Sequence, residues 1–158
     1  MGSALAPDNA FGIIQGLETV AVRMKQHCSN AEKAVEFLTK HKNVERVIYP
    51  TLHKGEIGQR AKKYFNGGNG ALVGIEVKGG VESGKKFIES LKMFYHVANI
   101  GDARSLAIHP ATTTHSQLTQ EELLAAGVTP GYVRLSIGIE HPDDIIADLD
   151  QALNASGS

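Results

Sequence analysis

The residues YVRLSIGIEHPDD (132–144) give the clearest indication of the fold. Residues 132–139 alternate between two faces, as in a β-strand with one buried side. One face carries Val133, Leu135, Ile137 and Ile139, and the other carries Tyr132, Arg134, Ser136 and Gly138. The residues HPDD (141–144) predict the start of a helix, because proline at the first position and acidic residues in the first turn favour a helix N-terminus. The apolar face of this final helix would hold Ile145, Ile146, Leu149 and Leu153.

The sequence predicts further strands over residues 44–49, 71–77 and 96–100. Helices are predicted over residues 8 to 40, with a break near Cys28 and a new cap at Ser29, and over 57–64, 81–93 and 119–126. Thr119 and Glu122 have the spacing of a capping box. Residues 101–118 show no regular period and predict a long loop. The expected fold class is α/β, a small α+β sandwich with a mostly antiparallel sheet of about three to five strands and helices on one side.

Length and composition indicate one domain and exclude several kinds of partner. The chain has 158 residues with a formal net charge of −1 and no run of a single charge sign, so neither nucleic acid nor an anionic membrane is an expected partner. The single cysteine, Cys28, allows no internal disulfide, which fits the reducing cytoplasm. No apolar run reaches the roughly 20 residues of a membrane span. We expect residues 1–6 to be an appended leader and linker, 7–154 the domain, and 155–158 a polar tail.

Arg134 is the strongest candidate for chemistry. In a strand whose same face carries small residues, a guanidinium has room above the sheet and suits a carboxylate through two parallel hydrogen bonds. The alternative is a structural arginine paired with an acid such as Glu140. A second candidate region runs from Asn99 through Gly101 and Asp102 to His109, Thr113 and His115. These side chains could line a site, or they could satisfy their own backbone turns. The two histidines have no metal-ligand spacing, so no metal is expected.

Three blocks of sequence resemble a known family: residues 9–31 (NAFGIIQGLETVAVRMKQHCSNA), 70–80 (GALVGIEVKGG) and 99–153, which begins NIGDARSLAIHPATTTHSQ. They resemble the C-terminal third of the pyridoxal-phosphate enzymes of cysteine and methionine metabolism, from about Ala4 to Leu153. The third block is most similar to the O-acetylhomoserine sulfhydrylase (homocysteine synthase) branch. Asn99 stands where related lyases and cystathionine synthases carry serine, and Thr112-Thr113 replaces their Ser-Met.

The resemblance implies the small C-terminal domain of the aspartate-aminotransferase-like, fold-type I enzymes. It implies that Arg134 holds the substrate α-carboxylate, that the backbone of Asn99 also touches it, and that the loop 101–116 borders the substrate entrance. The family's Schiff-base lysine and most cofactor contacts lie in the preceding domain, so we expect no catalytic residue and no bound pyridoxal phosphate in this chain alone.

The implied reaction of the whole enzyme is γ-replacement of acetate by sulfide or a thiol, in methionine biosynthesis. The implied partners are the chain's own N-terminal domain, neighbouring subunits of a homotetramer and an amino acid substrate. Two alternatives remain open. One is a fragment of a cystathionine γ-synthase or methionine γ-lyase. The other is a non-enzymatic module that binds small molecules or a partner protein.

Overall fold

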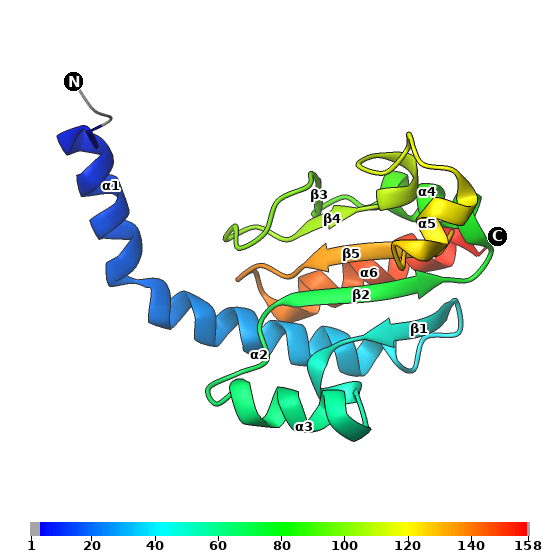
Figure 1. Ribbon diagram of the computed structural model, residues 1–158, viewed down its shortest axis with the longest axis horizontal. Helices are drawn as coiled ribbons and strands as arrows, with labels where there is room; N and C mark the ends of the chain where they lie inside the picture. Colours follow the sequence, from blue (N-terminus) through cyan, green and yellow to red (C-terminus); the bar gives the residue numbers. More distant parts are fainter. Residues whose placement is uncertain (1–3, 158) are drawn as a thin grey trace.

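The centre of the molecule is a five-stranded sheet in the order β1-β2-β5-β4-β3. The computed structural model describes residues 4–157. The strands are β1 (Val44–Ile48), β2 (Leu72–Val77), β3 (Tyr95–His96), β4 (Leu106–Ile108) and β5 (Tyr132–Ser136). All neighbouring pairs are antiparallel except β3 with β4. The predicted fold class is therefore confirmed, and β5, the strand that carries Arg134, is the central one (Figure 1).

Three long helices cover one face of this sheet: α2 (Val20–Leu38), α4 (Gly80–Ser90) and α6 (Pro142–Ser156) (Figure 1). The core lies between these helices and the strands, and alternate residues of β2 and β5 supply its sheet side. Val73, Ile75, Val133 and Leu135 are fully buried there. The residues between them face the opposite side of the sheet, which the long helices leave uncovered. The alternation of apolar and polar residues in the sequence thus correctly predicted the sheet face on which Arg134 lies.

The shorter elements lie around this sandwich. They are the 3-10 helices η1 (Pro50–Leu52) and η2 (Pro110–Thr112) and the α-helices α3 (Gly55–Tyr64) and α5 (Gln120–Ala125). The capping box of α5 is confirmed, because the Thr119 hydroxyl accepts from the Glu122 N–H while the Glu122 carboxylate accepts from the Thr119 N–H. Gly127 follows this helix with φ of 77°, a left-handed conformation that suits glycine.

The first predicted helix is divided, but the predicted position of the break is wrong. α1 (Pro7–Glu18) ends before Thr19, and α2 then runs without interruption through residues 28–30. Ser29 therefore lies inside a helix and caps nothing. The physical reason is burial, since His27, Asn30 and Ala31 all face the body of the protein. Interrupting the helix there would leave buried backbone groups without hydrogen-bond partners.

Three further predictions need correction. β4 was not predicted, because its three residues are buried on both faces and form an apolar run without alternation. The strand predicted over 96–100 is limited to Tyr95–His96, which pair with β4, and residues 97–100 are exposed. α6 continues to Ser156, whose hydroxyl donates to the Leu153 carbonyl, so the tail predicted from residue 155 begins as helix. Residues 1–3 and 158, part of the predicted leader and tail, lie outside the described residues.

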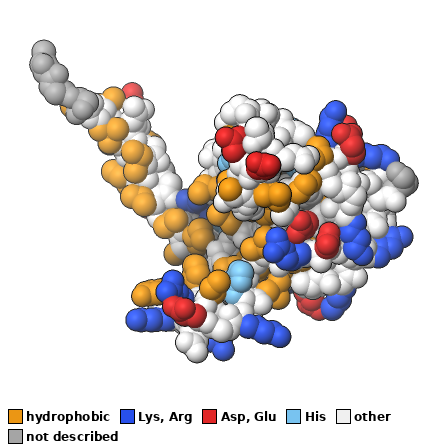
Figure 2. All heavy atoms as spheres, turned by 45° about the vertical axis from the view of Figure 1, so that its right-hand side comes forward, with side chains coloured by type: hydrophobic (Ala, Val, Ile, Leu, Met, Phe, Trp, Pro, Cys, Tyr) orange, Lys and Arg blue, Asp and Glu red, His pale blue; other side chains and the backbone are white. Residues whose placement is uncertain are grey.

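α1 and the first turns of α2 project from the body as an arm (Figure 1), and this arm exposes large apolar side chains. α1 has no buried residue, and the side chains of Phe11, Ile14 and Leu17 are 65%, 53% and 62% exposed. Hydrophobic side chains line this arm and continue onto the adjoining part of the body (Figure 2). Each such side chain gains about 1.5–3 kcal/mol when it becomes fully buried, so an arm of this kind favours association.

We therefore predict that the 158-residue chain self-associates through the arm, with Phe11, Ile14 and Leu17 in the contact. Replacing Ile14 and Leu17 together by lysine should shift the chain toward monomer in sedimentation equilibrium. The matched control replaces Gln15 and Asn9, polar residues of the same helix, by lysine, and should leave the association unchanged. A clean monomer for the unmodified chain at high concentration would contradict the prediction.

Candidate functional site

Arg134 lies in the middle of β5, between Gly74 of β2 and Ile108 of β4. Its neighbours Val133 and Leu135 point into the core, so the Arg134 side chain points to the sheet face without long helices. The absence of a Cβ at Gly74 leaves room for the ring of Tyr132, since a Cβ there would lie 2.8 Å from the Tyr132 Cε2 atom. The sequence predicted open space above the small residues on the Arg134 face of the strand. Above the neighbouring Gly74 of β2, that space holds the Tyr132 ring.

The charge of Arg134 is not matched by a nearby acid. The predicted alternative, an ion pair with Glu140, does not form, because Glu140 accepts from the Ser105 N–H at 2.6 Å and from the Ser105 hydroxyl at 2.9 Å. Within residues 4–157, Arg134 makes no salt bridge and donates one hydrogen bond, from Nη2 to the Asn99 carbonyl at 3.2 Å. A guanidinium has five N–H donors, so most of them remain available.

The loop that carries Asn99 is attached to the same strand. The Gly101 N–H donates to the Ser136 hydroxyl at 3.3 Å, one strand period beyond Arg134. Gly101 has φ of 74°, and this left-handed turn follows directly after Asn99 and Ile100. The Asn99 side chain accepts from the Ile100 N–H at 2.9 Å, which holds the turn from inside. Arg134, Asn99 and Gly101 are thus brought together in the structure, and Ser136 joins them, whereas their binding of a substrate carboxylate stays a prediction.

Tyr132 adds an aromatic wall beside this group. It is half-buried on the same face as Arg134, at the next alternate position of β5. Burial raises the pKa of the Tyr132 phenol above its usual value, and the positive charge of Arg134 opposes that shift. The phenol therefore stays neutral at physiological pH and offers a hydroxyl without adding charge to the site.

The other predicted site residues form no hydrogen bond or ion pair with Arg134 within residues 4–157. The Asp102 carboxylate accepts from the Arg104 N–H at 3.0 Å, within its own turn. The Thr113 hydroxyl donates to the His109 carbonyl at 2.8 Å, and the His115 ring nitrogen Nδ1 lies 2.8 Å from the Thr114 hydroxyl. These contacts match the alternative that the sequence left open, in which hydroxyls and imidazoles satisfy local turns. A role of these residues at the substrate entrance stays a prediction.

His109 is fully buried on the helix side of the sheet and faces away from Arg134. Its Nε2 lies 2.8 Å from the Pro130 carbonyl and its Nδ1 2.9 Å from the Thr112 hydroxyl. Because a carbonyl only accepts, Nε2 carries the proton and Nδ1 is the acceptor. The ring fits against α4 at Gly84, where a Cβ would come within 2.7 Å of Nε2. His109 therefore connects η2, the turn before β5 and α4.

Burial lowers the pKa of His109 below 6.5, against the opposing effect of its bond to the Pro130 carbonyl, and nearby His96 lowers it further. The unfolded chain then binds a proton that the folded chain resists, so stability is fully present above pH 6.5 and falls as the pH drops toward the folded pKa. His109→Gln should be less stable near pH 7.5, by about 1–3 kcal/mol, but should lose less stability on acidification. Urea unfolding at several pH values between about 7.5 and 5 measures this, with the exposed His53→Gln as control. Parallel pH profiles for wild type and His109→Gln would contradict it.

Among residues 4–157, no lysine is placed to hold an aldehyde cofactor. A lysine that binds an aldehyde cofactor is held beside the substrate and away from bulk water, whereas every lysine described here is exposed and none lies in the strand that carries Arg134. No cluster of three or more His, Cys, Asp or Glu side chains suited to a metal occurs among residues 4–157. None of the helices in this part of the chain has the length and hydrophobicity to span a bilayer.

The structure is a small α/β domain whose central strand presents Arg134 on the open face of the sheet, without a salt bridge among residues 4–157. The chain belongs to the Cys/Met metabolism PLP-dependent enzymes, whose family model matches residues 1–154. It is 56% identical to an O-acetyl-L-homoserine sulfhydrylase of Leptospira meyeri over 97% of the chain, and 48% identical to an L-methionine gamma-lyase of Fusobacterium nucleatum subsp. polymorphum over 96%. These matches span 35% and 38% of the two relatives' lengths, so the chain corresponds to about a third of each.

A solved structure agrees with this assignment. It is a putative O-acetylhomoserine (thiol)-lyase of Campylobacter jejuni, with 47% identity and a TM-score of 0.88 over 97% of this chain and 36% of that one. That protein carries a pyridoxyl-lysine adduct, whose lysine lies outside the part that this chain covers. The family is therefore pyridoxal-phosphate-dependent, and the whole enzymes have a larger N-terminal part that this chain does not include.

Proposed function

We propose that this chain forms the substrate-carboxylate side of a pyridoxal-phosphate-dependent O-acetylhomoserine sulfhydrylase. The single observation that carries the proposal is Arg134, half-buried on the open sheet face and without an acidic partner among residues 4–157. A buried or half-buried charge without a partner is costly unless a ligand supplies one. The α-carboxylate of an amino acid is the ligand whose shape and charge suit a guanidinium fork.

In this proposal Arg134 binds and orients the substrate. It transfers no proton, because its guanidinium group stays protonated at physiological pH. The Asn99 carbonyl fixes one edge of the guanidinium, which leaves the remaining donors directed at the carboxylate. Pyridoxal phosphate, when bound in such an enzyme, supplies a conjugated ring that withdraws electrons from the substrate α-carbon. The reaction of the whole enzyme would replace acetate on the γ-carbon by sulfide or a thiol.

We also propose that the apolar arm docks on the N-terminal part of the same enzyme and on neighbouring subunits of a homotetramer, in the cytoplasm. Phe11, Ile14 and Leu17 would be buried in that assembly. The arm is the exposed surface best suited to this role, because helix α1 buries nothing in the chain alone.

A second candidate reaction is γ-elimination, because L-methionine gamma-lyases are among the relatives at 48% identity. The two reactions share the carboxylate site and diverge after the γ-substituent has left. Elimination releases an α-keto acid and ammonia, whereas replacement keeps the amino acid and adds sulfide.

The test joins the N-terminal part of the Leptospira meyeri sulfhydrylase to this chain and assays the chimera beside its parent enzyme. We expect homocysteine from O-acetyl-L-homoserine and sulfide. Release of α-keto acid from L-methionine instead would favour the lyase alternative. A folded chimera that binds pyridoxal phosphate yet catalyses neither reaction would overturn the proposal and favour a non-enzymatic binding module.

A further inference from the structure

Asn30 of α2 is buried and binds two backbone carbonyls of a distant segment. The side chain is 1% exposed, and its amide donates to the carbonyls of Gly138 at 3.0 Å and Glu140 at 2.8 Å. The Asn30 oxygen accepts from Gln26 Nε2 at 2.7 Å, so its amide donors and its oxygen are all occupied. One turn earlier, His27 Nδ1 lies 2.7 Å from the Ile137 carbonyl and must be the donor. Helix α2 thus holds the backbone of residues 137–140, directly after β5.

On its other edge, the segment 137–140 forms hydrogen bonds with the loop before β4. The Ile139 N–H donates to the Ala103 carbonyl, and the Gly138 N–H donates to the Ser105 hydroxyl, both at 2.9 Å. The fit at Gly138 is tight, because a Cβ there would lie 2.5 Å from the Ala103 oxygen. A displacement of residues 137–140 would therefore move residues 103–105 with it.

The beginning of this loop carries the site. Four residues before Ala103 lies Asn99, whose carbonyl accepts from Arg134, and Gly101 between them is held by Ser136. Asn99 and Ile100 are exposed and have no strand or helix of their own to fix them. Their position depends on the attachments at Gly101 and at residues 103–105.

We infer that Asn30 is a positioning residue for the carboxylate site, although it does not touch the substrate. By holding the Gly138 and Glu140 carbonyls it fixes residues 137–140. These residues hold the loop 99–105 against β5, and the loop sets the Asn99 carbonyl against Arg134. Because α2 also carries the base of the projecting arm, these contacts link the arm to the carboxylate site. The inference rests on the proposed role of Arg134 in carboxylate binding.

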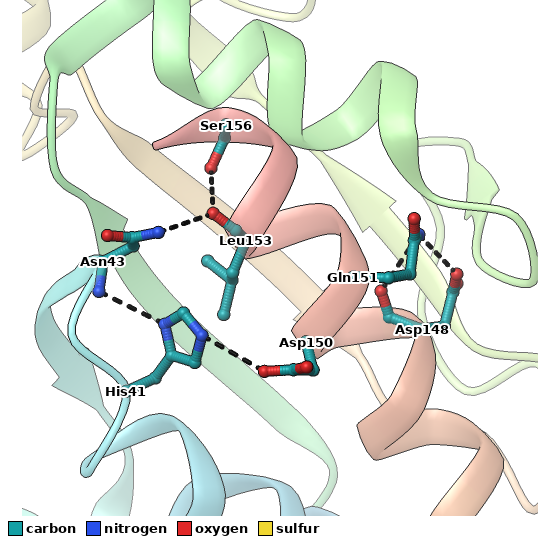
Figure 3. A network of polar contacts seen from close by, with 7 residues as sticks. All are labelled: His41, Asn43, Asp148, Asp150, Gln151, Leu153 and Ser156. Carbon is teal, nitrogen blue, oxygen red and sulfur yellow. Dashed lines mark hydrogen bonds and ion pairs between the residues drawn. The ribbon is translucent and has the colours of Figure 1, made fainter. Parts of the chain in front are cut away.

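The first test measures amide hydrogen exchange by NMR in the 158-residue chain. Asn30→Ala should speed exchange at Gly101, Gly138 and Ile139 by about tenfold relative to the amides of β1 and β2. The matched control is Asn43→Ala, which removes a similar side-chain bond, from Nδ2 to the Leu153 carbonyl at 2.8 Å, at the far end of the molecule (Figure 3). The control should leave that ratio unchanged. An unchanged ratio in Asn30→Ala, or a uniform increase over the whole sheet, would overturn the inference.

A milder variant keeps the test decisive if Asn30→Ala does not fold. Gln26 is exposed, and Gln26→Ala removes only the partner of the Asn30 oxygen. It should speed exchange at the same three amides by a smaller factor, about two- to threefold. No change at these amides in the folded Gln26→Ala chain would count against the inference.

A kinetic readout in the chimeric enzyme separates positioning from stability. Asn30→Ala should raise KM for O-acetyl-L-homoserine about tenfold with kcat changed less than about threefold, and Asn43→Ala should change neither. Arg134→Ala in the same assay tests the proposed function. If Arg134→Ala leaves KM unchanged, the proposed function fails. If Arg134→Ala raises KM and Asn30→Ala does not, the inference alone fails.

Discussion

Replacing Arg134 by alanine in the chimeric enzyme is expected to lower kcat/KM for O-acetyl-L-homoserine by about 10²–10³. Two charge-assisted hydrogen bonds to a carboxylate contribute about 3–4 kcal/mol together, and each 1.4 kcal/mol corresponds to a factor of ten. Arg134 has donors available for such a pair, because its one bond in residues 4–157 goes to the Asn99 carbonyl. Most of the loss should be in KM, since the carboxylate is bound in the ground state and in the transition state alike.

Two further variants sharpen this result. Arg134→Lys keeps the charge but loses the planar fork, so it should recover only part of the lost activity. Arg46→Ala is the matched control, because Arg46 is also a strand arginine but is already paired with Glu76 at 3.1 Å. It should leave KM within about twofold of the parent value. Equal effects of Arg46→Ala and Arg134→Ala would mean that Arg134 is a structural residue.

The sheet could be predicted where one of its faces is buried and the other is not. The alternation of residues 132–139 identified β5 and gave the direction of Arg134, because a half-buried strand imposes a period of two on its sequence. β4 could not be predicted in this way, because its residues are buried on both faces and show no alternation of apolar and polar side chains. The break in the first helix was misplaced for a related reason. Burial of Asn30 and Ala31 by the body keeps α2 continuous, and no local sequence preference records a contact with residues 138–140.

The site could be predicted only as far as its strand and its loop could be recognised. The residues alone gave Arg134 and Asn99 as separate candidates, and only the family resemblance implied that both touch one carboxylate; in the structure, Arg134 Nη2 donates to the Asn99 carbonyl. His109, in contrast, drew attention by its residue type, yet both of its ring nitrogens are occupied in the interior. Ser136 was seen only as a small neighbour of Arg134. Its hydrogen bond to Gly101 spans 35 residues of sequence, and contacts of that range leave no periodic signal.

Among the substitutions named above, Asp148→Ala is expected to lower the free energy of unfolding most, by about 3–5 kcal/mol. Asp148 lies in α6 and is 6% exposed, and its carboxylate accepts from the backbone N–H groups of Lys92, Met93 and Phe94. Gln151 Nε2 also donates to it, at 3.0 Å (Figure 3). Alanine would leave these donors without an acceptor in a region closed to water, and each buried unsatisfied donor costs about 1–3 kcal/mol. The turn between α4 and β3 would lose its attachment to α6.

Asp150→Ala is the matched control for this effect, in the same helix and two residues further along. The Asp150 side chain is 50% exposed and lies 3.3 Å from His41 Nε2 (Figure 3). The His41 side chain is only 7% exposed, but the Asp150 carboxylate is half-exposed, so water can take its place beside His41 Nε2. Asp150→Ala should therefore change the free energy of unfolding by at most about 1 kcal/mol. Urea unfolding of both variants at neutral pH, followed by far-UV circular dichroism, gives the comparison. If Asp148→Ala costs no more than Asp150→Ala, then water reaches the turn at Lys92–Phe94 and replaces the carboxylate, and the turn is held by the surrounding core packing of Phe94 instead.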